Sequence, residues 1–574
     1  MRILPGDVGQ DIAKKPAQPP GPRAMRLQAA VLARSRARAA ARGRTPAEAD
    51  REARVEVLGD RLEMLEFTLN EYVDKLDGLV LTHAHEDHLG AVPYLWPRLQ
   101  CPIWCVPFTA AVLKRKLDES GIRRGVPLNV VQPGEDFTVG PFTCRFVHMT
   151  HSIPEAAMLV IETPQGRVVH TGDWKLDPAP QVGAVSEIEA LQDVGKGGVL
   201  AMVADSTNIM SPGTSGSEAE VLESLSELIA AQPHRVVLTT FASNVARLHT
   251  AMQAGRAAGR EVVLIGRSMH RMVAAAKDCG YLTDAPPLLD ERDIMDLPRN
   301  RVMMVCTGSQ AEPRAAIARI AAGNHPRIRL DGGDSVIFSS KIIPGNERVI
   351  YDLHNNLVRA GVQVITEDDH FVHVSGHPSR DEVAQLYRWV KPRIAVPVHG
   401  ELRHLREHVA FAEANGAEHA LLVTDGDLVR LAPGAPEIEG EVPIGRHAFE
   451  DGEMIAVDAD RFRLRRKLAS NGTVFLSLVL DHAGSVLAPP QVASVGSVEL
   501  DDDADARRRL ADALVEEIEG LDDHEVETNA KIEERLRSAV RRLLGLSRER
   551  RPVIQVQITR LSPDMLAQLE DVST

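Results

Sequence analysis

A dense group of metal-binding side chains follows a short apolar run. Leu79-Val80-Leu81 leads into Thr82-His83-Ala84-His85-Glu86-Asp87-His88, which holds three imidazoles and two carboxylates. Side chains alternate along an extended strand, so the first two histidines point the same way, and the following turn can direct the aspartate and third histidine elsewhere. Neutral imidazole and carboxylate suit zinc, and a catalytic zinc needs only about three protein ligands. The pattern therefore predicts a metal site rather than a solvated polar loop.

The composition is typical of a folded cytoplasmic protein with several domains. A length of 574 residues suggests about three or four domains. No run of about 18 uncharged apolar residues is present, so we expect no membrane span. The five cysteines are scattered, which argues against a disulfide framework and fits a reducing cytoplasm. With a net charge of -15, nucleic-acid binding would need a local basic groove or bound cations.

Composition and apolar patterning divide the chain into five segments. Short strand-like runs alternate with helical stretches in the second segment, which predicts a layered α/β domain. A new unit begins near Ser217, whose spacing to Glu220 predicts a helix with a capping box. The fourth segment again pairs strands with histidine loops, so we expect the third segment to be inserted into one domain. The segments are an atypical extension at 1–75, the α/β domain at 76–212 and 369–435, the inserted unit at 213–368 and a small α+β domain at 450–574.

Histidine-bearing loops follow or end five of the strand-like runs. Loops at one edge of a sheet can converge even when they are far apart in the sequence. We therefore expect these loops to build one site. They span residues 83–88, 150–152, 170–173, 373–377 and 398–400.

Taken in order, the motifs resemble the metallo-β-lactamase superfamily, specifically its β-CASP nucleases, and above all the ribonuclease J family. The resemblance implies an αββα sandwich with an inserted β-CASP α/β domain and a small α+β C-terminal domain. The motifs are Thr-His-Ala-His-Glu-Asp-His at 82–88, Thr-His-Ser-Ile-Pro at 150–154, His-Thr-Gly-Asp-Trp-Lys at 170–175, Asp-Ser-Thr-Asn at 205–208, Thr-Phe-Ala-Ser-Asn at 240–244, Thr-Gly-Ser-Gln-Ala-Glu-Pro at 307–313, Ile-Pro-Gly-Asn-Glu at 343–347, Val-Ser-Gly-His at 374–377 and Pro-Val-His-Gly-Glu at 397–401.

Carried over residue by residue, the resemblance implies two zinc ions per subunit, with manganese or magnesium as alternatives. Asp173 would bridge the ions, because a carboxylate has two oxygens to share and a neutral imidazole has one lone pair. Two such ions activate water and stabilise the oxygens of a phosphoryl displacement, so Asp87 and Asp173 count as catalytic. The implied ligands are His83, His85 and His151 for one ion and Asp87, His88 and His399 for the other.

The resemblance also implies a substrate-binding loop. His377 would contact the scissile phosphate or protonate the leaving oxygen, because its ordinary pKa lies near neutrality. Hydroxyl, amide and backbone N–H groups would hold phosphate or nucleotide, although plain turn chemistry also explains Ser and Asn in such loops. His148 and His170 are expected to be structural, and Asp205 to support the site. The implied substrate-binding residues are His373, Val374, Ser375, Gly376, His377, Ser243 and Asn244.

The chain departs from the family pattern before Leu79. The family begins with a strand and a glycine-rich Glu-Ile-Gly loop, then a strand with Asp-x-Gly, and residues 1–75 contain neither. Their absence would leave a sheet edge and an apolar face uncovered. We hypothesise that the Arg/Ala/Pro-rich start reflects a shifted reading frame or a misplaced start.

The resemblance implies a zinc-dependent ribonuclease with 5′-to-3′ exonuclease and endonuclease activity in rRNA processing and mRNA decay. The expected partners are RNA and further copies of the chain, as a dimer or tetramer, and no membrane. Two other readings stay open: a DNA nuclease or hydrolase of small esters, and a catalytically impaired RNA-binding or scaffold subunit.

Overall fold

The computed structural model describes residues 76–566, except 123–124, 443, 451–452, 498–499, 523–525, 527 and 546–551. The expectations for residues 1–75 therefore lie outside the described residues. The chain forms two compact units, one that ends at Ile444 and one that begins at Gly445. Within the described residues, no helix is both long and apolar enough to cross a membrane.

Two facing sheets form the centre of the first domain. The smaller sheet is parallel, with strand order β1-β2-β3, and the larger is mixed, with order β15-β14-β8-β7-β6-β5-β4. The strands are β1 (Leu79–Leu81), β2 (Ile103–Cys105), β3 (Leu128–Val130), β4 (Asp136–Val139), β5 (Phe142–His148), β6 (Ala157–Thr163), β7 (Gly166–His170), β8 (Val199–Asp205), β14 (Pro392–Val398) and β15 (His419–Ala420). The helices are α4 (Glu86–Leu89), α5 (Val92–Leu99), α6 (Pro107–Glu119), α7 (Ile188–Lys196), α13 (Arg380–Val390) and α14 (Leu402–Ala414).

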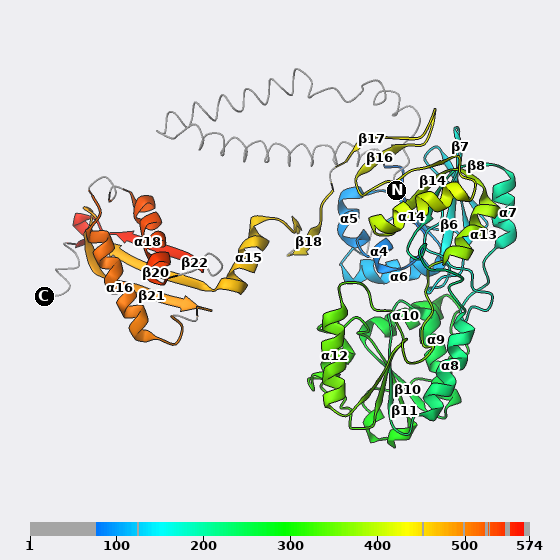
Figure 1. Cartoon of the computed structure of the whole chain (residues 1–574), viewed down its shortest axis with the longest axis horizontal. Coiled ribbons are helices and arrows are strands. Elements are labelled where there is room, and N and C mark those ends of the chain that lie inside the picture. Colours follow the sequence, from blue (N-terminus) through cyan, green and yellow to red (C-terminus); the bar gives the residue numbers. More distant parts are fainter. Residues whose placement is uncertain are drawn as a thin grey trace. The chain divides into compact units, whose positions relative to one another are not determined.

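Strand alternation produces two cores on the faces of the larger sheet. Phe146 lies in the core between the sheets, where Val80 and Trp104 of the smaller sheet pack. Its neighbour Val147 points to the opposite face and packs in the cluster that α7, α13 and α14 cover (Figure 1). Helices α5 and α6 cover the other face of the smaller sheet. This arrangement is the predicted αββα sandwich.

The chain leaves this domain after β8 and returns at β14. These two strands are parallel neighbours, with Val398 opposite Asp205. Between them the chain forms the inserted domain, as the sequence predicted, and then α13, which packs on the larger sheet. The carboxyl ends of β8 and β14 lie at the same edge of the larger sheet.

The inserted domain is a five-stranded parallel sheet between two layers of helices. Its strand order is β10-β11-β9-β12-β13. Helices α8, α9 and α10 pack on one face, and α11 and α12 pack on the other. The elements are α8 (Glu218–Ala231), β9 (Val236–Thr239), α9 (Val245–Ala257), β10 (Glu261–Ile265), α10 (Arg267–Asp278), the 3-10 turns Ile294–Asp296 and Arg299–Arg301, β11 (Val302–Cys306), α11 (Ala316–Ala321), β12 (Ser335–Phe338), α12 (Glu347–Arg359) and β13 (Gln363–Ile365).

Helix α8 begins at the predicted capping box. The Ser217 hydroxyl accepts a hydrogen bond from the backbone N–H of Ala219, and Glu220 accepts one from the Ser217 backbone N–H at 3.0 Å. These bonds satisfy N–H groups that have no partner inside the helix.

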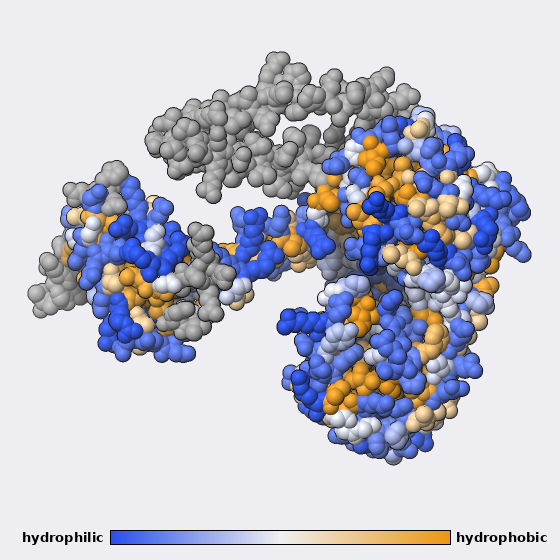
Figure 2. Space-filling view, viewed as in Figure 1, coloured by the Kyte–Doolittle hydropathy of each residue, from blue (hydrophilic) through white to orange (hydrophobic). Residues whose placement is uncertain are grey.

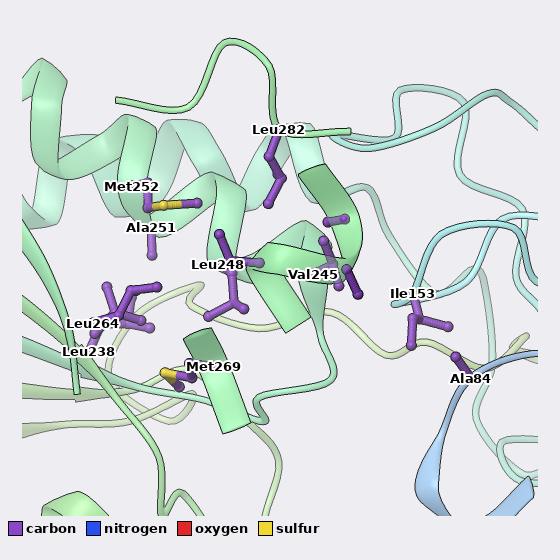
Figure 3. Packing of buried hydrophobic residues seen from close by; sticks show 14 of the residues in the cluster. Ala84, Ile153, Leu238, Val245, Leu248, Ala251, Met252, Leu264, Met269 and Leu282 are labelled. Carbon is purple, nitrogen blue, oxygen red and sulfur yellow. The ribbon is translucent and has the colours of Figure 1, made fainter. Parts of the chain in front are cut away.

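One apolar cluster joins the inserted domain to the first domain. Figure 3 shows Leu248 and Met252 of α9 packed beside Leu238 and Leu264 of the sheet, with Ala84 of the histidine-rich loop in the same cluster. Two ion pairs, Arg115–Asp278 and Arg271–Glu119, link α6 to α10. The histidine-rich loop is therefore held against both domains.

The second unit is an α+β domain, as predicted for the tail. A three-stranded sheet of order β21-β20-β22 packs with α16 and α18 around an apolar core. Its elements are α15 (Asp460–Asn471), β20 (Thr473–Leu480), β21 (Val486–Val495), α16 (Ala504–Glu519), α18 (Asn529–Leu543) and β22 (Val553–Arg560). The hairpin of β18 (His447–Glu450) with β19 (Glu453–Ala456) precedes them in this unit, and the hairpin of β16 (Asp427–Arg430) with β17 (Glu437–Glu441) ends the first unit.

A fully buried arginine ties the inserted domain to the predicted substrate loop. Arg247 of α9 pairs with Glu218 of α8 at 3.0 Å, and both side chains are almost completely buried. Arg247 also donates to Ser339 Oγ at 2.6 Å and to the carbonyl of Val372 at 2.9 Å. Because Val372 directly precedes His373, this network fixes the start of the loop.

Replacing Arg247 should destabilise the protein strongly. We expect Arg247→Met to lower the free energy of unfolding by about 3–5 kcal/mol, because Glu218 would remain buried without its partner. Urea denaturation followed by circular dichroism measures the change. As a control, Arg145→Met removes the exposed pair with Asp136 and should change stability by less than about 1 kcal/mol. Equal effects of the two substitutions would contradict this account.

Candidate metal centre

The structure brings the five predicted histidine-bearing segments together. Strands β7, β8 and β14 are parallel neighbours, so their carboxyl ends lie at one edge of the larger sheet. Asp173 follows β7, Asp205 ends β8 and His399 follows β14. Imidazole rings from separate segments then meet: the ring centres of His151 and His377 are 5.2 Å apart, as are those of His377 and His399.

Four residues form a first group that can hold a cation. Ligand atoms of His83, His85, His151 and Asp173 all lie within 4.8 Å of one another. His151 Nδ1 donates to the Gly376 carbonyl at 2.6 Å, which leaves its Nε2 lone pair free, 3.0 Å from His85 Nδ1. His83 Nε2 is buried and has no hydrogen-bond partner among the described residues. A divalent cation would satisfy these lone pairs, so the donor set fits zinc.

A second group shares Asp173 with the first. Ligand atoms of Asp87, His88, Asp173 and His399 also lie within 4.8 Å of one another. Asp173 Oδ2 is 3.2 Å from His88 Nε2 and 3.5 Å from His399 Nε2. Both ligand sets inferred from the sequence therefore occur as spatial groups, with Asp173 between them. The His/Asp cluster is suited to a divalent metal.

Asp205 orients two histidines of the site. Its Oδ2 lies 2.7 Å from His377 Nδ1, and its Oδ1 accepts from the Thr207 hydroxyl at 2.8 Å. That hydroxyl is also 2.8 Å from His399 Nδ1, so it can accept the imidazole proton while it donates to Asp205. His399 Nε2 is then the nitrogen that faces Asp87 and Asp173.

Burial and nearby carboxylates set different charges on the histidines. Burial lowers the pKa of His85 to about 4 and holds the pKa values of His83 and His151 well below the ordinary value, so these rings are neutral. Burial also acts to lower the pKa of His377, but the charge and hydrogen bond of Asp205 outweigh it and raise this pKa. In the metal-free chain, contacts with Asp205 and Asp87 likewise outweigh burial and raise the pKa of His399 to about 11.

The predicted substrate loop passes directly beside this cluster. At Gly376 an added Cβ would come within 2.8 Å of the His151 ring, so the close approach requires glycine. Ser375 Oγ accepts from the His377 backbone N–H at 3.1 Å. The Val374 side chain instead packs in the apolar core, and Nδ1 of the partly buried His373 ring lies 3.5 Å from the Arg247 guanidinium.

The two residues predicted from the β9–α9 loop differ in their roles. Asn244 Oδ1 accepts from the Arg247 backbone N–H at 2.8 Å, so its side chain caps α9. That is the turn chemistry which the sequence left open. Ser243 lines a small cavity of about 190 Å³ together with Ala84 and Glu86 of the histidine-rich loop.

Sequence reasoning missed the contributions of Thr207 and Asn208. Both belong to the 205–208 motif, and Asn208 Nδ2 donates to Ser375 Oγ at 2.7 Å and to the His377 carbonyl at 3.0 Å. The available signal was a run of polar side chains directly after a buried strand. His148 lies outside the ligand groups, with Nε2 3.0 Å from the Ala184 carbonyl, and His170 Nδ1 accepts from the Gly172 backbone N–H.

Replacing one of the proposed histidine ligands should abolish metal binding at this site. We expect His85→Ala to weaken metal binding more than 100-fold, because even residues that only orient ligands contribute about 10- to 100-fold. Plasma mass spectrometry of zinc in the purified protein measures this. The control His148→Ala removes a nearby histidine outside the ligand groups and should keep its zinc. Full zinc content in His85→Ala would refute the ligand assignment.

Comparisons with known proteins agree with this geometry. Four families match successive parts of the chain: "Beta-lactamase superfamily domain" at residues 59–195, "Ribonuclease J, beta-CASP domain" at 233–357, "Zn-dependent metallo-hydrolase RNA specificity domain" at 361–422 and "Ribonuclease J C-terminal domain" at 461–561. The first of these matches begins within the segment 1–75.

Three curated relatives are similar over most of this chain, and each is named Ribonuclease J. The protein of Sinorhizobium meliloti is 42% identical, over 86% of this chain and 88% of its own length. That of Mycolicibacterium smegmatis is 36% identical, over 85% and 87%. That of Corynebacterium glutamicum is 38% identical, over 75% and 60%. The chain therefore belongs to the ribonuclease J family of metal-dependent ribonucleases with the metallo-β-lactamase fold.

Proposed function

We propose that this ribonuclease binds two zinc ions and cleaves RNA as a 5′-to-3′ exonuclease and an endonuclease, in rRNA processing and mRNA decay. The observation that carries the proposal is the position of Asp173. Its carboxylate belongs to both ligand groups, as expected of a residue that bridges two cations. Manganese or magnesium can take the place of zinc.

His83, His85, His151 and Asp173 would hold one ion, and Asp87, His88, His399 and Asp173 the other. When bound, two divalent cations supply activated water and stabilise charge on the attacking and leaving oxygens. The buried neutral imidazoles keep their lone pairs directed inward. Thr207 and Gly376 fix the orientation of His399 and His151 through the nitrogen of each ring that does not face the cluster.

His377 acts on the leaving oxygen. Asp205 holds the Nδ1 side of this ring at 2.7 Å and raises its pKa, which favours the protonated form of the imidazole. The opposite nitrogen can give that proton to the departing ribose oxygen. Asn208 fixes the backbone of the same loop through the His377 carbonyl, and Ser375 and backbone N–H groups receive the phosphate.

RNA is the substrate that fits the domain arrangement. The inserted domain packs beside the histidine-rich loop, and a junction between two domains can hold an extended strand. We further propose that the chain works in the cytoplasm as a homodimer or homotetramer. Size-exclusion chromatography with light scattering tests the oligomeric state.

A substrate panel tests the activity. We expect cleavage of RNA labelled at either end, with release of mononucleotides from the 5′ end and faster attack on 5′-monophosphate than on 5′-triphosphate RNA. Labelled DNA and a generic ester provide the comparison. Preferred cleavage of either, or RNA binding with no cleavage by the zinc-loaded protein, would refute the proposal.

Removing the proposed acid should separate catalysis from metal binding. We expect His377→Ala to lower kcat for RNA by about 100- to 10,000-fold, the usual contribution of a positioned acid or base. Single-turnover cleavage measures this loss, and zinc content should match the wild type. The proposed role fails if kcat falls less than tenfold while zinc is retained.

A further inference from the structure

A second cavity lies in the inserted domain, and its lining is separate from the metal-binding groups. Its volume is about 250 Å³, and it is lined by Ser309, Phe338, Ser340, Tyr351, His354 and Glu367, among others. Pockets that bury drug-sized ligands are larger, about 300–1,000 Å³, so this cavity suits a single ring system.

The topology of the sheet places this cavity where α/β folds bind ligands. Strand β9 comes first, β10 and β11 lie on one side of it, and β12 and β13 lie on the other. The chain therefore reverses direction next to β9, and such a switch point opens a crevice outside the carboxyl ends of the strands. Ser309 follows β11, Ser340 follows β12 and Glu367 follows β13, so the lining comes from that edge.

Two buried polar atoms in the lining have no hydrogen-bond partner within the described part of the chain. They are Ser309 Oγ, in a residue only 2% exposed, and His354 Nε2. An unpaired buried polar group is unfavourable, so a ligand with polar atoms on its edge would be stabilised here. Burial lowers the pKa of His354, and a neutral imidazole can donate or accept a hydrogen bond.

The walls of this cavity provide aromatic rings and hydrogen-bond acceptors. The centre of the His354 ring lies 4.3 Å from the centre of the Phe338 ring and 6.2 Å from that of the Tyr351 ring. Tyr351 is 54% exposed at the rim of the cavity. Figure 2 shows apolar residues exposed beside α12, which carries His354 and Tyr351. Glu367 is acceptor-only when ionised, so it favours a ring with N–H donors and disfavours phosphate.

We propose that this cavity binds a nucleobase, either one base of an RNA chain or the base of a free nucleoside. The choice of a base among planar ligands rests on the proposed RNA substrate. Bases that leave the stack are bound by aromatic faces and by polar groups along their edges, and this lining offers both. The cavity also adjoins the catalytic loop, because Ser339, next to Ser340, donates to the Val372 carbonyl at 2.7 Å.

Equilibrium dialysis of the full zinc-loaded chain with labelled guanosine tests the proposal. Guanosine has N–H donors for Glu367 and no phosphate that could bind at the metal centre. We expect Tyr351→Ala and His354→Ala each to weaken guanosine binding about tenfold, as loss of a stacking contact does. The control Val358→Ala removes an exposed side chain of α12 that does not line the cavity, and it should bind guanosine like the wild type.

A phosphorothioate RNA oligomer that resists cleavage then distinguishes the two sources of the base. Displacement of guanosine by the oligomer assigns the cavity to RNA, and its absence assigns the cavity to free nucleosides. No guanosine binding at millimolar concentration, or equal binding by all three variants, would overturn the proposal. His377→Ala should still bind guanosine, so failure of the cavity and failure of the cleavage mechanism give different results.

Discussion

The buried carboxylate of Asp173 is the constraint on which the site depends. It is 3% exposed, and a charge removed from water is unfavourable by several kcal/mol unless opposite charges or strong hydrogen bonds surround it. Its neighbours are imidazoles from two separate segments, at 3.2 Å for His88, 3.6 Å for His83 and 3.5 Å for His399. Divalent cations between these groups would neutralise the carboxylate and use the free lone pairs. The same bound cations would therefore stabilise the buried carboxylate and take part in catalysis.

The fold brings these charged groups together by placing the carboxyl ends of parallel strands side by side. Asp173 follows β7, Asp205 ends the adjacent strand β8, and the chain returns from the insertion to β14, the next strand in the sheet. The inserted domain then fixes the remaining part of the site. Its Arg247 holds the carbonyl of Val372, and Gly376 further along the same segment accepts from His151. A rearrangement in the inserted domain would therefore reach His151, a proposed metal ligand, through a few hydrogen bonds.

The overall charge of -15 agrees with this account of RNA recognition. An acidic chain does not attract RNA through its net charge, so attraction must arise locally. Bound divalent cations are the largest charges such a site can hold, and the proposed metal centre would concentrate them at the point of cleavage. The acceptor-rich cavity beside α12 has the opposite character and suits a base rather than a phosphate.

The sequence by itself determined the residue types, their order and the local elements. The strand-like run at Phe146-Val147, the capping box at Ser217 and the run of metal-binding side chains at 83–88 follow from short-range patterns, because period and spacing are local properties. The full ligand sets came from the family resemblance. Only the tertiary structure decided how these parts are used. It placed Val374 in the core and joined Asn208 to the loop at 375–377. These outcomes depend on contacts between segments up to about 170 positions apart, such as Asn208 with His377 at a separation of 169. No local pattern encodes such a contact, because it exists only when both sheets and the inserted domain have formed.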